Sequence, residues 1–298
     1  MFCKKNAQKK PVLYACGNVI SRKGSYSMSI EIPNVKVERF DIIDSTNSEA
    51  KRRFSGVDAS CYSSLHKTLL VAEEQSAGRG RLGRSFYSPA KTGVYFSLIF
   101  VDNAISAPST ITASAAVAVC RAISSVFSVS AKIKWVNDVF VDGKKVCGIL
   151  TEGIENAKSG KIEAAIIGIG ITILPNPNMP KSLEKIIGKI CDFKLKETGD
   201  FEKWLSEKKD NLIQETVFQL LKILENSDEE FPLAMREYKD RSNLLGTTIT
   251  FSPVIGDEKK NFHCTVLDIT DDAKLVVQMN DGSKKTLESG EVTLHKDY

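Results

Sequence analysis

A run of glycines and arginines excludes two common nucleotide-binding folds. It reads GRGRLGRS over residues 78–85 and matches two phosphate-loop patterns, GxGxxG and, with arginine in place of lysine, GxxxxGKS. Both patterns hold phosphate at the first turn of a helix that follows immediately. Here Phe86-Tyr87-Ser88-Pro89 follows, and Pro89 together with Gly93 argues against a helix. The run therefore predicts neither a dinucleotide-binding fold nor a P-loop fold.

The run lies inside a longer basic stretch, residues 75–91, which we call the Arg-Gly loop. This stretch holds four bases, three glycines and no acidic residue. Glycine lets the backbone approach a ligand closely, and arginine presents a planar fork to phosphate or carboxylate. Taken alone, the loop is also typical of a solvated basic turn or of an RNA contact, and both interpretations stay open at this point.

Around the loop, the hydrophobic pattern predicts a mixture of strands and helices. Capping residues at 44–47 precede a short helix expected at 48–54, and an Ala-rich segment predicts a long helix at 109–127. Strands are expected at 37–43, 68–72, 94–101, 132–136, 139–141, 146–150 and 162–173. From residue 181 to residue 238 the period becomes helical.

The last part of the chain changes pattern again. Short apolar runs at 247–251, 263–268, 275–278, 284–287 and 292–294 alternate with turn signals, which predicts a small β-barrel. A length of 298 residues suits one or two domains at about 150 residues each. We expect an α+β fold in three parts: a mobile basic leader at 1–35, a catalytic domain at 36–240 and a C-terminal domain at 241–298.

The net charge of the chain comes from the leader. Residues 1–35 carry six bases and one acid, a net of +5 within a total of +4, which leaves −1 for residues 36–298. A near-neutral body argues against a protein that holds nucleic acid on a broad basic face, although it leaves room for a small basic pocket. Because the leader has no sustained period, we expect a mobile tail or a basic, acid-poor transit peptide.

Composition argues against several other classes. With 42% hydrophobic and 26% charged residues, the chain is typical of a globular protein. The longest apolar run, residues 164–174, is too short to cross a bilayer, so no transmembrane helix is expected. Seven scattered cysteines without a CxxC pair favour a reducing compartment, and three distant histidines give little material for imidazole chemistry.

Three further segments carry chemistry-bearing side chains. Residues 134–138, KWVND, end a strand with an amide and a carboxylate, which suit a nucleotide or a metal, or simply a turn. Lys145 follows a tight turn at the mouth of an apolar strand, where its ammonium faces either a ligand above the sheet or solvent. Gly168 and Gly170 interrupt a buried strand, which marks the close approach of a ligand or a β-bulge.

The order of these segments resembles one family, the biotin protein ligases. The similar motifs are STN at 45–47, GRGRLG at 78–83, KWxND at 134–138, KxxGILxE at 145–152 and GxGI at 168–171. The resemblance covers about residues 37–175, and residues 241–298 resemble the small SH3-like C-terminal domain of the family. It implies an α+β, mixed-sheet biotin/lipoate-ligase-like catalytic domain. The N-terminal DNA-binding domain of repressor-type members has no counterpart in residues 1–35, so we expect a ligase without repressor function.

The resemblance also implies an activity. Such ligases activate biotin with ATP as biotinoyl-5′-AMP and transfer it to a lysine of the biotin-carrier domain of a carboxylase, such as acetyl-CoA carboxylase. ATP and Mg²⁺ are the implied cofactors. Biotin, ATP and the carrier domain are the implied partners, with no DNA and no membrane, for a monomer or a homodimer. We expect a cytoplasmic location, with organellar targeting by the leader as the alternative.

The residue roles follow from the same resemblance. Catalysis falls to Lys145 and Arg81. The residues implied for biotin are Ser45, Thr46, Asn47, Gln75, Arg79, Gly80, Arg81, Lys145 and Gly148. Those implied for ATP and the adenylate are Arg79, Arg81, Arg84, Phe86, Trp135, Asn137, Asp138, Lys145, Gly168, Gly170 and Thr172. Asn137 and Asp138 are also implied for the metal. We expect the Arg-Gly loop to be mobile without biotin and to exclude water once ordered.

Three positions depart from the family pattern. Leu82 stands where some members carry arginine, Phe86 where many carry tryptophan, and Thr172 where many carry asparagine, which puts the adenine contact of Thr172 in doubt. A lipoate or octanoate ligase of the same fold is the rival enzyme, but hydroxyl and amide groups at residues 45, 46 and 75 suit a ureido ring better than an alkyl tail. The non-enzymatic alternative is an RNA-binding module using the Arg-Gly loop, against which the near-neutral body counts.

Overall fold

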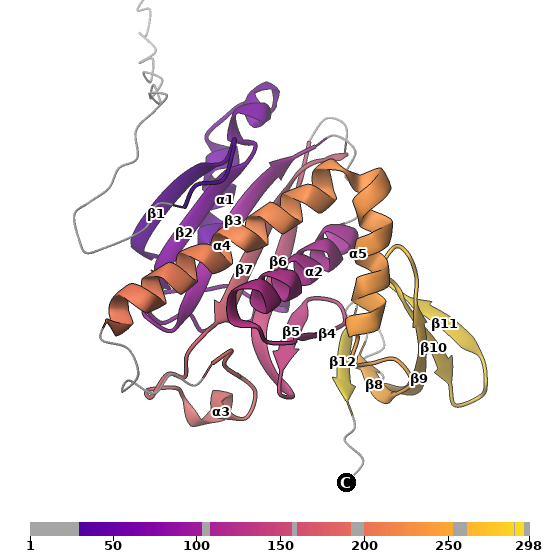
Figure 1. Ribbon diagram of the computed structural model, residues 1–298. Helices are drawn as coiled ribbons and strands as arrows, with labels where there is room; N and C mark the ends of the chain where they lie inside the picture. Colours follow the sequence, from indigo (N-terminus) through magenta and orange to yellow (C-terminus); the bar gives the residue numbers. More distant parts are fainter. Residues whose placement is uncertain are drawn as a thin grey trace, which may run out of the picture.

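The computed structural model describes residues 30–102, 108–156, 160–191, 200–252, 261–288 and 290–294. Within these ranges the chain forms a seven-stranded sheet with helices on both faces, and a second, five-stranded sheet closer to the C-terminus (Figure 1). This arrangement confirms the predicted α+β class with a mixed main sheet and a smaller β unit.

The main sheet has the strand order β1-β2-β3-β7-β6-β5-β4. Its strands are β1 Lys36–Ile43, β2 Thr68–Gln75, β3 Gly93–Val101, β4 Lys132–Lys134, β5 Asp138–Val141, β6 Lys144–Glu155 and β7 Ile162–Thr172. β1 and β2 are parallel, and the other neighbours are antiparallel. β3 and β7 are buried along nearly their whole length, which explains why their sequences are apolar without alternation.

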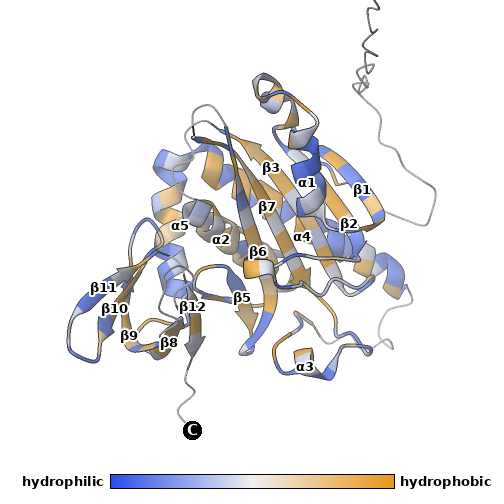
Figure 2. Cartoon of the chain, turned by 180° about the vertical axis from the view of Figure 1, so that it is seen from behind, coloured by the Kyte–Doolittle hydropathy of each residue, from blue (hydrophilic) through white to orange (hydrophobic). Residues whose placement is uncertain are grey.

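Helices cover both faces of this sheet. Helices α2 (Pro108–Phe127) and α4 (Phe201–Glu225) cross one face, and α1 (Thr46–Ser55) lies on the other, as the two opposite views in Figures 1 and 2 show. Among the described helices, α2 is also long and apolar enough to cross a membrane, but 67% of that apolar segment is buried inside the fold. Its row of alanines packs against the sheet and against α4.

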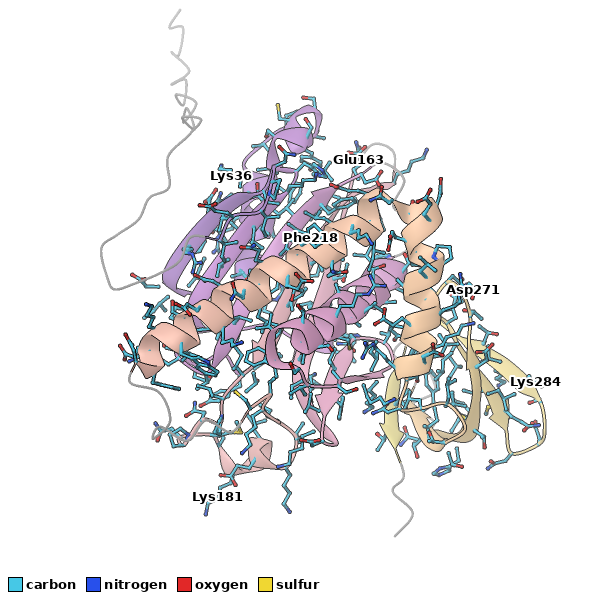
Figure 3. All side chains as sticks on the ribbon, viewed as in Figure 1. Lys36, Glu163, Lys181, Phe218, Asp271 and Lys284 are labelled. Carbon is cyan, nitrogen blue, oxygen red and sulfur yellow. The ribbon has the colours of Figure 1, made fainter. Side chains whose placement is uncertain are left out.

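Shorter elements complete the main body. They are the 3-10 segments η1 (Ala59–Leu65) and η2 (Arg81–Gly83), α3 (Lys181–Glu184) and α5 (Ser227–Arg241). The outer side of α4 carries Phe218, whose side chain is exposed (Figure 3). α5 leads from the main body into the second sheet, and its Tyr238 hydroxyl donates to the Val136 carbonyl at 3.1 Å.

The second sheet is antiparallel with the order β11-β10-β9-β8-β12. Its strands are β8 Thr248–Ser252, β9 Phe262–Ile269, β10 Leu275–Met279, β11 Lys284–Leu287 and β12 Glu291–Leu294. The Trp135 indole N–H donates to the Ala273 carbonyl at 2.7 Å, and the apolar core runs continuously from the main body into this sheet. The two sheets therefore pack against each other and are not separate domains joined by a linker.

Several expected boundaries differ from the structure, and three of the differences have a clear structural reason. The first helix begins at Thr46 rather than at 48, because Ser45 already serves as its N-cap. The strand expected at 132–136 ends at Lys134, where the chain turns into the 135–137 segment. The leader was expected to extend to residue 35, but Ile30 and Ile32 are buried against the core, so its boundary falls before Ile30. Residues 1–29 lie outside the described ranges.

Candidate active site

A cavity of about 360 Å³ opens where five segments meet: the N-terminus of α1, the Arg-Gly loop, residues 134–138, the β6–β7 strands and β12 with the residue before it. It is lined by every residue predicted for the site except Thr172. Thr172 pairs with Gly93 at the end of β7, away from this lining. The sequence analysis assigned no role to the remaining lining residues, which are Ser85, Phe96, Lys134, Ile149, Leu150, Ile169, Gly290, Val292 and Thr293.

One wall is the first turn of α1. Ser45 caps the helix, and its hydroxyl accepts from the Ser48 N–H at 3.4 Å. Ser45, Thr46 and Asn47 are 2–4% exposed, although all three are polar. Polar groups this deep need partners; Ser45 finds one in α1, whereas Thr46 and Asn47 find theirs on the strands below.

The side-chain amide of Asn47 is hydrogen-bonded to other protein groups. Its Nδ2 donates to the Leu150 carbonyl at 3.2 Å and to Glu152 Oε2 at 2.9 Å, and its Oδ1 accepts from the Ser97 hydroxyl at 2.6 Å. Both amide hydrogens are therefore committed. The geometry supports a role in holding α1 on the sheet more directly than a role in contacting a ligand.

Glycine is required beneath Asn47. A Cβ on Gly168 would lie 2.1 Å from Asn47 Oδ1, far inside van der Waals contact. The sequence suggested the close approach of a ligand at Gly168; in this structure the group that approaches is the Asn47 side chain. No signal in the sequence connects the two residues, which are 121 positions apart.

Glu152 ties three segments together. Lys51 Nζ lies 2.6 Å from Oε1, and the two terminal nitrogens of Arg79 lie 3.2 and 3.3 Å from the carboxylate oxygens. Burial alone would raise the pKa of Glu152, but hydrogen bonds from Lys51 and Asn47, with the charges of Lys51 and Arg79, lower it below its ordinary value. The carboxylate therefore stays ionised and holds Arg79 of the Arg-Gly loop beside α1.

The Arg-Gly loop forms a narrow hairpin of its own. The Phe86 N–H donates to the Gly78 carbonyl at 2.8 Å, and the Gly80 N–H donates to the Arg84 carbonyl at 2.7 Å. At its tip Leu82 has φ 57° and a 53% exposed side chain. As expected, no helix follows the glycines. Mobility of this loop without biotin stays a prediction.

The aromatic ring of Phe86 covers the floor of the cavity. Gly148 and Gly170 are directly paired across β6 and β7. Cβ atoms at these positions would lie 2.8 and 2.2 Å from the Phe86 ring. The two glycines therefore form a flat surface on which a ring lies directly against the backbone.

Cations dominate the charge of the cavity. Among the side chains that the structure describes, five cations and a single carboxylate, Asp138, line it; the cations are Arg79, Arg81, Arg84, Lys134 and Lys145. A site of this charge, partly closed from water, attracts polyanions such as nucleotide phosphates and carboxylic acids.

Lys145 and its neighbour Lys144 have different surroundings. Lys145 lines the cavity and its Nζ lies 2.6 Å from Asp138 Oδ1. Lys144 is exposed and donates to the Glu184 carbonyl at 3.1 Å, outside the cavity. The alternation of side chains along β6 produces this difference.

The pair proposed for a metal is engaged by cations instead. Asn137 Oδ1 accepts from Arg81 at 3.0 Å, and its Nδ2 donates to the Ile149 carbonyl at 3.0 Å. Asp138 faces Lys145. Among the described residues, no group of three or more His, Cys, Asp or Glu side chains gathers as a metal site. These residues do not fit a protein-built magnesium site.

The second sheet supplies part of the wall. Gly290, Val292 and Thr293 line the cavity, and the Gly290 carbonyl accepts from Arg81 at 3.4 Å. Trp135 was predicted to contact the adenylate; it lines the cavity, but its N–H is donated to Ala273 of the second sheet. This contribution from the second sheet depends on tertiary packing, so the sequence pattern did not reveal it.

The sequence around this cavity is similar to that of known proteins. Residues 42–172 match the model of the biotin/lipoate A/B protein ligase family. The bifunctional ligase/repressor BirA of Bacillus subtilis is 41% identical over 121 residues, which are 40% of this chain and 37% of that protein. The biotin--[acetyl-CoA-carboxylase] ligase of Paracoccus denitrificans is 33% identical over 138 residues, 45% of this chain and 53% of that protein. The matches thus span about a third to a half of the length of these relatives.

Solved structures share the fold over most of the chain. The biotin protein ligase of Aquifex aeolicus, in complex with biotin and ATP, has a TM-score of 0.64 at 24% identity and covers 88% of this chain and 99% of its own. The Leishmania major biotin protein ligase in complex with biotinyl-5-AMP has a TM-score of 0.53 at 19% identity, covering 87% and 100%. The motifs, the cavity and the family match agree on the same part of the chain: residues 42–172 are similar to the biotin/lipoate A/B protein ligase family.

Proposed function

We propose that this protein is an ATP-dependent biotin protein ligase. It activates biotin as biotinoyl-5′-AMP and transfers the biotinoyl group to a lysine of the biotin-carrier domain of a carboxylase, such as acetyl-CoA carboxylase. One observation carries the proposal: a compact polar wall at Ser45, Thr46 and Gln75 and a cluster of five cations line the same cavity. The names of the relatives and the family match support the same activity.

The first step joins two anions. A carboxylate oxygen of biotin attacks the α-phosphorus of ATP, the bond to the bridging oxygen breaks, and pyrophosphate leaves with the bonding electrons. Repulsion between the reactants and the charge that develops on the phosphoryl oxygens both call for preorganised cations. Arg81 and Lys145 stand in the cavity wall to provide them, and Arg81 is aligned by Asn137 and the Gly290 carbonyl.

The second step is an acyl transfer. The neutral amine of the acceptor lysine attacks the acyl carbon, the bond from that carbon to the phosphate oxygen breaks, AMP leaves as a stable anion, and the amine nitrogen loses one proton to solvent. Lys145 is placed to stabilise negative charge on the acyl oxygen and on the departing phosphate, because its ammonium lies at the cavity surface near Gly148. In the free protein this ammonium is paired with Asp138, so an incoming anion competes with that carboxylate.

The binding of the acid rests on donors and acceptors at the α1 end. Gln75 Oε1 already accepts from the Thr46 N–H and hydroxyl, at 2.9 and 3.2 Å, and its Nε2 donates one hydrogen to Ser88. The second amide hydrogen of Gln75 is then the group available to a ureido oxygen. An alkyl chain or dithiolane ring would leave such groups without partners, at a cost in binding.

The proposal extends to cofactor, partners and location. Mg²⁺ would enter with the triphosphate, whose oxygens are its usual ligands in such sites. We propose a monomer or homodimer that does not bind DNA. We also propose a cytoplasmic location, with organellar targeting as the alternative; Cys61, Cys120, Cys147 and Cys264 are free thiols, which suits a reducing compartment.

The test uses the purified full-length protein. It is incubated with ATP, Mg²⁺ and labelled biotin, and protein-retained biotinoyl-adenylate is measured, together with ATP–pyrophosphate exchange. We expect biotin to support exchange and lipoate to give at most a small fraction of that rate. An exchange rate with lipoate equal to the rate with biotin would contradict the substrate assignment and favour a lipoate or octanoate ligase of the same fold.

A further inference from the structure

A chain of hydrogen bonds runs from α1 into the Arg-Gly loop, behind the cavity wall. It begins at the Thr46 N–H, which donates to Gln75 Oε1 at 2.9 Å. Gln75 Nε2 then donates to the Ser88 hydroxyl at 2.9 Å, and this hydroxyl donates to the Phe86 carbonyl at 3.0 Å. The chain connects the polar end of the cavity with the segment that carries the Phe86 ring.

The two end groups fix the donor-to-acceptor direction of this chain of hydrogen bonds. A main-chain N–H can only donate, so the atom of Gln75 that faces Thr46 must be its oxygen. A carbonyl can only accept, so Ser88 must donate to Phe86 and therefore accept from Gln75. Reversing the Gln75 amide would place two donors against each other at Thr46. The chain thus has one arrangement and cannot relax into another without breaking.

Gly78 is packed against the middle of the chain. A Cβ at this position would lie 2.3 Å from the Phe86 carbonyl oxygen, 2.7 Å from Ser88 Oγ and 3.2 Å from Gln75 Nε2. Gly78 is buried and does not line the cavity. The first glycine of the Arg-Gly loop is therefore required by this hydrogen-bond chain, which is an observation independent of the bonds themselves.

Ser88 is the link between the two ends. It is 3% exposed and does not line the cavity, so it cannot contact a ligand there directly. Thr46 and Gln75 line one end, and Phe86 covers Gly148 and Gly170 at the other. Both neighbours of the Ser88 hydroxyl belong to segments that line the cavity.

We propose that Ser88 is a positioning residue that couples the two ends of the cavity. A ligand held at Thr46 and Gln75 fixes the orientation of the Gln75 amide. Through Ser88, it also fixes the position of the Phe86 carbonyl and therefore of the Phe86 ring. This inference rests on the proposed function, in which the acid occupies the first end and the nucleotide the second. The coupling is reciprocal, because each ligand must strengthen the other by the same factor.

The experiment measures that factor in the full-length protein. The dissociation constant of α,β-methylene-ATP, which cannot release pyrophosphate, is determined by calorimetry without biotin and with saturating biotin. The ratio of the two constants is the coupling factor. We expect a factor of about ten or more in the wild type, and a factor near one in Ser88→Ala, because the loss of one or two net hydrogen bonds corresponds to about a tenfold change.

Two variants serve as controls. Ser88→Thr keeps the hydroxyl and should keep the coupling. Ser76→Ala removes an exposed hydroxyl from the same loop, which makes only a 3.5 Å contact with the Ile43 carbonyl, and should behave as the wild type. Thermal midpoints are measured in parallel, since a purely structural role would lower stability without changing the ratio.

The outcomes separate the claims. Three results would each overturn the role of the Ser88 hydroxyl. The coupling factor could be the same in the wild type and in Ser88→Ala, or it could be one in the wild type. Coupling could also be lost in Ser88→Thr or in Ser76→Ala. A wild-type protein that binds neither biotin nor the nucleotide analogue contradicts the proposed function itself, and this is seen before any variant is compared.

Discussion

Lys145 and Lys144 stand one residue apart on β6, yet only Lys145 reaches the cavity. We expect Lys145→Ala to slow adenylate formation by about 10²–10³, roughly 2.7–4 kcal/mol, which is the usual loss when one preorganised transition-state donor is removed. Folding should be intact, because the side chain lies at the surface of a cavity rather than in the core. Single-turnover adenylation with ATP and biotin is the measurement.

Lys144→Ala is the matched control for this substitution. Its ammonium contacts the Glu184 carbonyl outside the cavity, so its removal should leave the adenylation rate nearly unchanged. Equal effects of the two substitutions would show that Lys145 is not the catalytic lysine.

Gly168 offers a second test at the residue scale. An added methyl group would meet Asn47 Oδ1 at 2.1 Å and push Asn47 away from Ser97, Leu150 and Glu152. We expect Gly168→Ala to lower the free energy of unfolding by about 1–3 kcal/mol, as other overpacked core positions do, and to weaken biotin binding as α1 shifts. Urea unfolding and biotin titration measure the two effects.

Gly56→Ala provides the comparison for Gly168→Ala. Gly56 follows α1 with φ −92°, and a Cβ there would make ordinary contacts at 3.5 and 3.6 Å. Its substitution should change the free energy of unfolding by no more than about 0.5 kcal/mol. If both substitutions weaken biotin binding alike, the contact between Gly168 and Asn47 does not position the wall.

At the scale of elements, the segment before β1 belongs to the fold. Ile30 and Ile32 are buried against the core, and the Glu31 N–H donates to Gln214 of α4 at 3.4 Å. Deleting residues 1–29 should leave both stability and biotin transfer unchanged. Deleting residues 1–35 should leave the chemistry in place but destabilise the protein, by at most about 1.5–3 kcal/mol for each isoleucine.

The two deletions are compared by thermal unfolding and by biotin transfer to a carrier domain. Equal thermal midpoints would show that the Ile30 and Ile32 contacts add nothing to stability. A loss of transfer beyond roughly tenfold after deletion of residues 1–29, about 1.4 kcal/mol of barrier, would give the leader a catalytic or structural role that its sequence does not indicate.

Element types were readable from the sequence because their patterns are local. The apolar runs of β3 and β7 and the capping cluster before α1 determine those elements almost alone. The residues that hydrogen-bond to the cavity wall could not be predicted in this way. Ser88 and Ser97 are ordinary serines in the sequence, and only their burial beneath Thr46 and Gln75 gives them a role. The wall formed by Val292 and Thr293 depends on how two sheets pack.

At the scale of the whole molecule, His66 links stability to pH. The Val101 N–H donates to His66 Nδ1 at 3.0 Å, so that nitrogen carries no proton, and burial together with the Lys67 charge lowers the pKa of His66 below its ordinary 6.5. A lowered pKa means that the unfolded chain takes up the proton first. Stability from this group is therefore complete above pH 6.5 and is lost as pH falls towards the folded-state pKa.

We expect the urea midpoint of the wild type to fall between pH 7.5 and pH 5.5 by more than that of His66→Gln, which cannot take up the proton. Comparing the two proteins removes the contribution of the other histidines and of the carboxylates. An equal fall in both proteins would show that His66 is not responsible for stability loss in this range.

The wall that β12 adds to the cavity has a consequence for protein synthesis. Ser45 and Thr293 face the same space but are made at nearly opposite ends of the described chain. A ribosome-bound chain that has not yet passed residue 294 can form much of the main sheet, but its pocket stays open to water on that side. On the proposed function, an adenylate formed in such a chain would be exposed to water on that side. Synthesis of β12 thus closes this side of the pocket, and chains stalled before and after β12 should differ in how long they retain the adenylate.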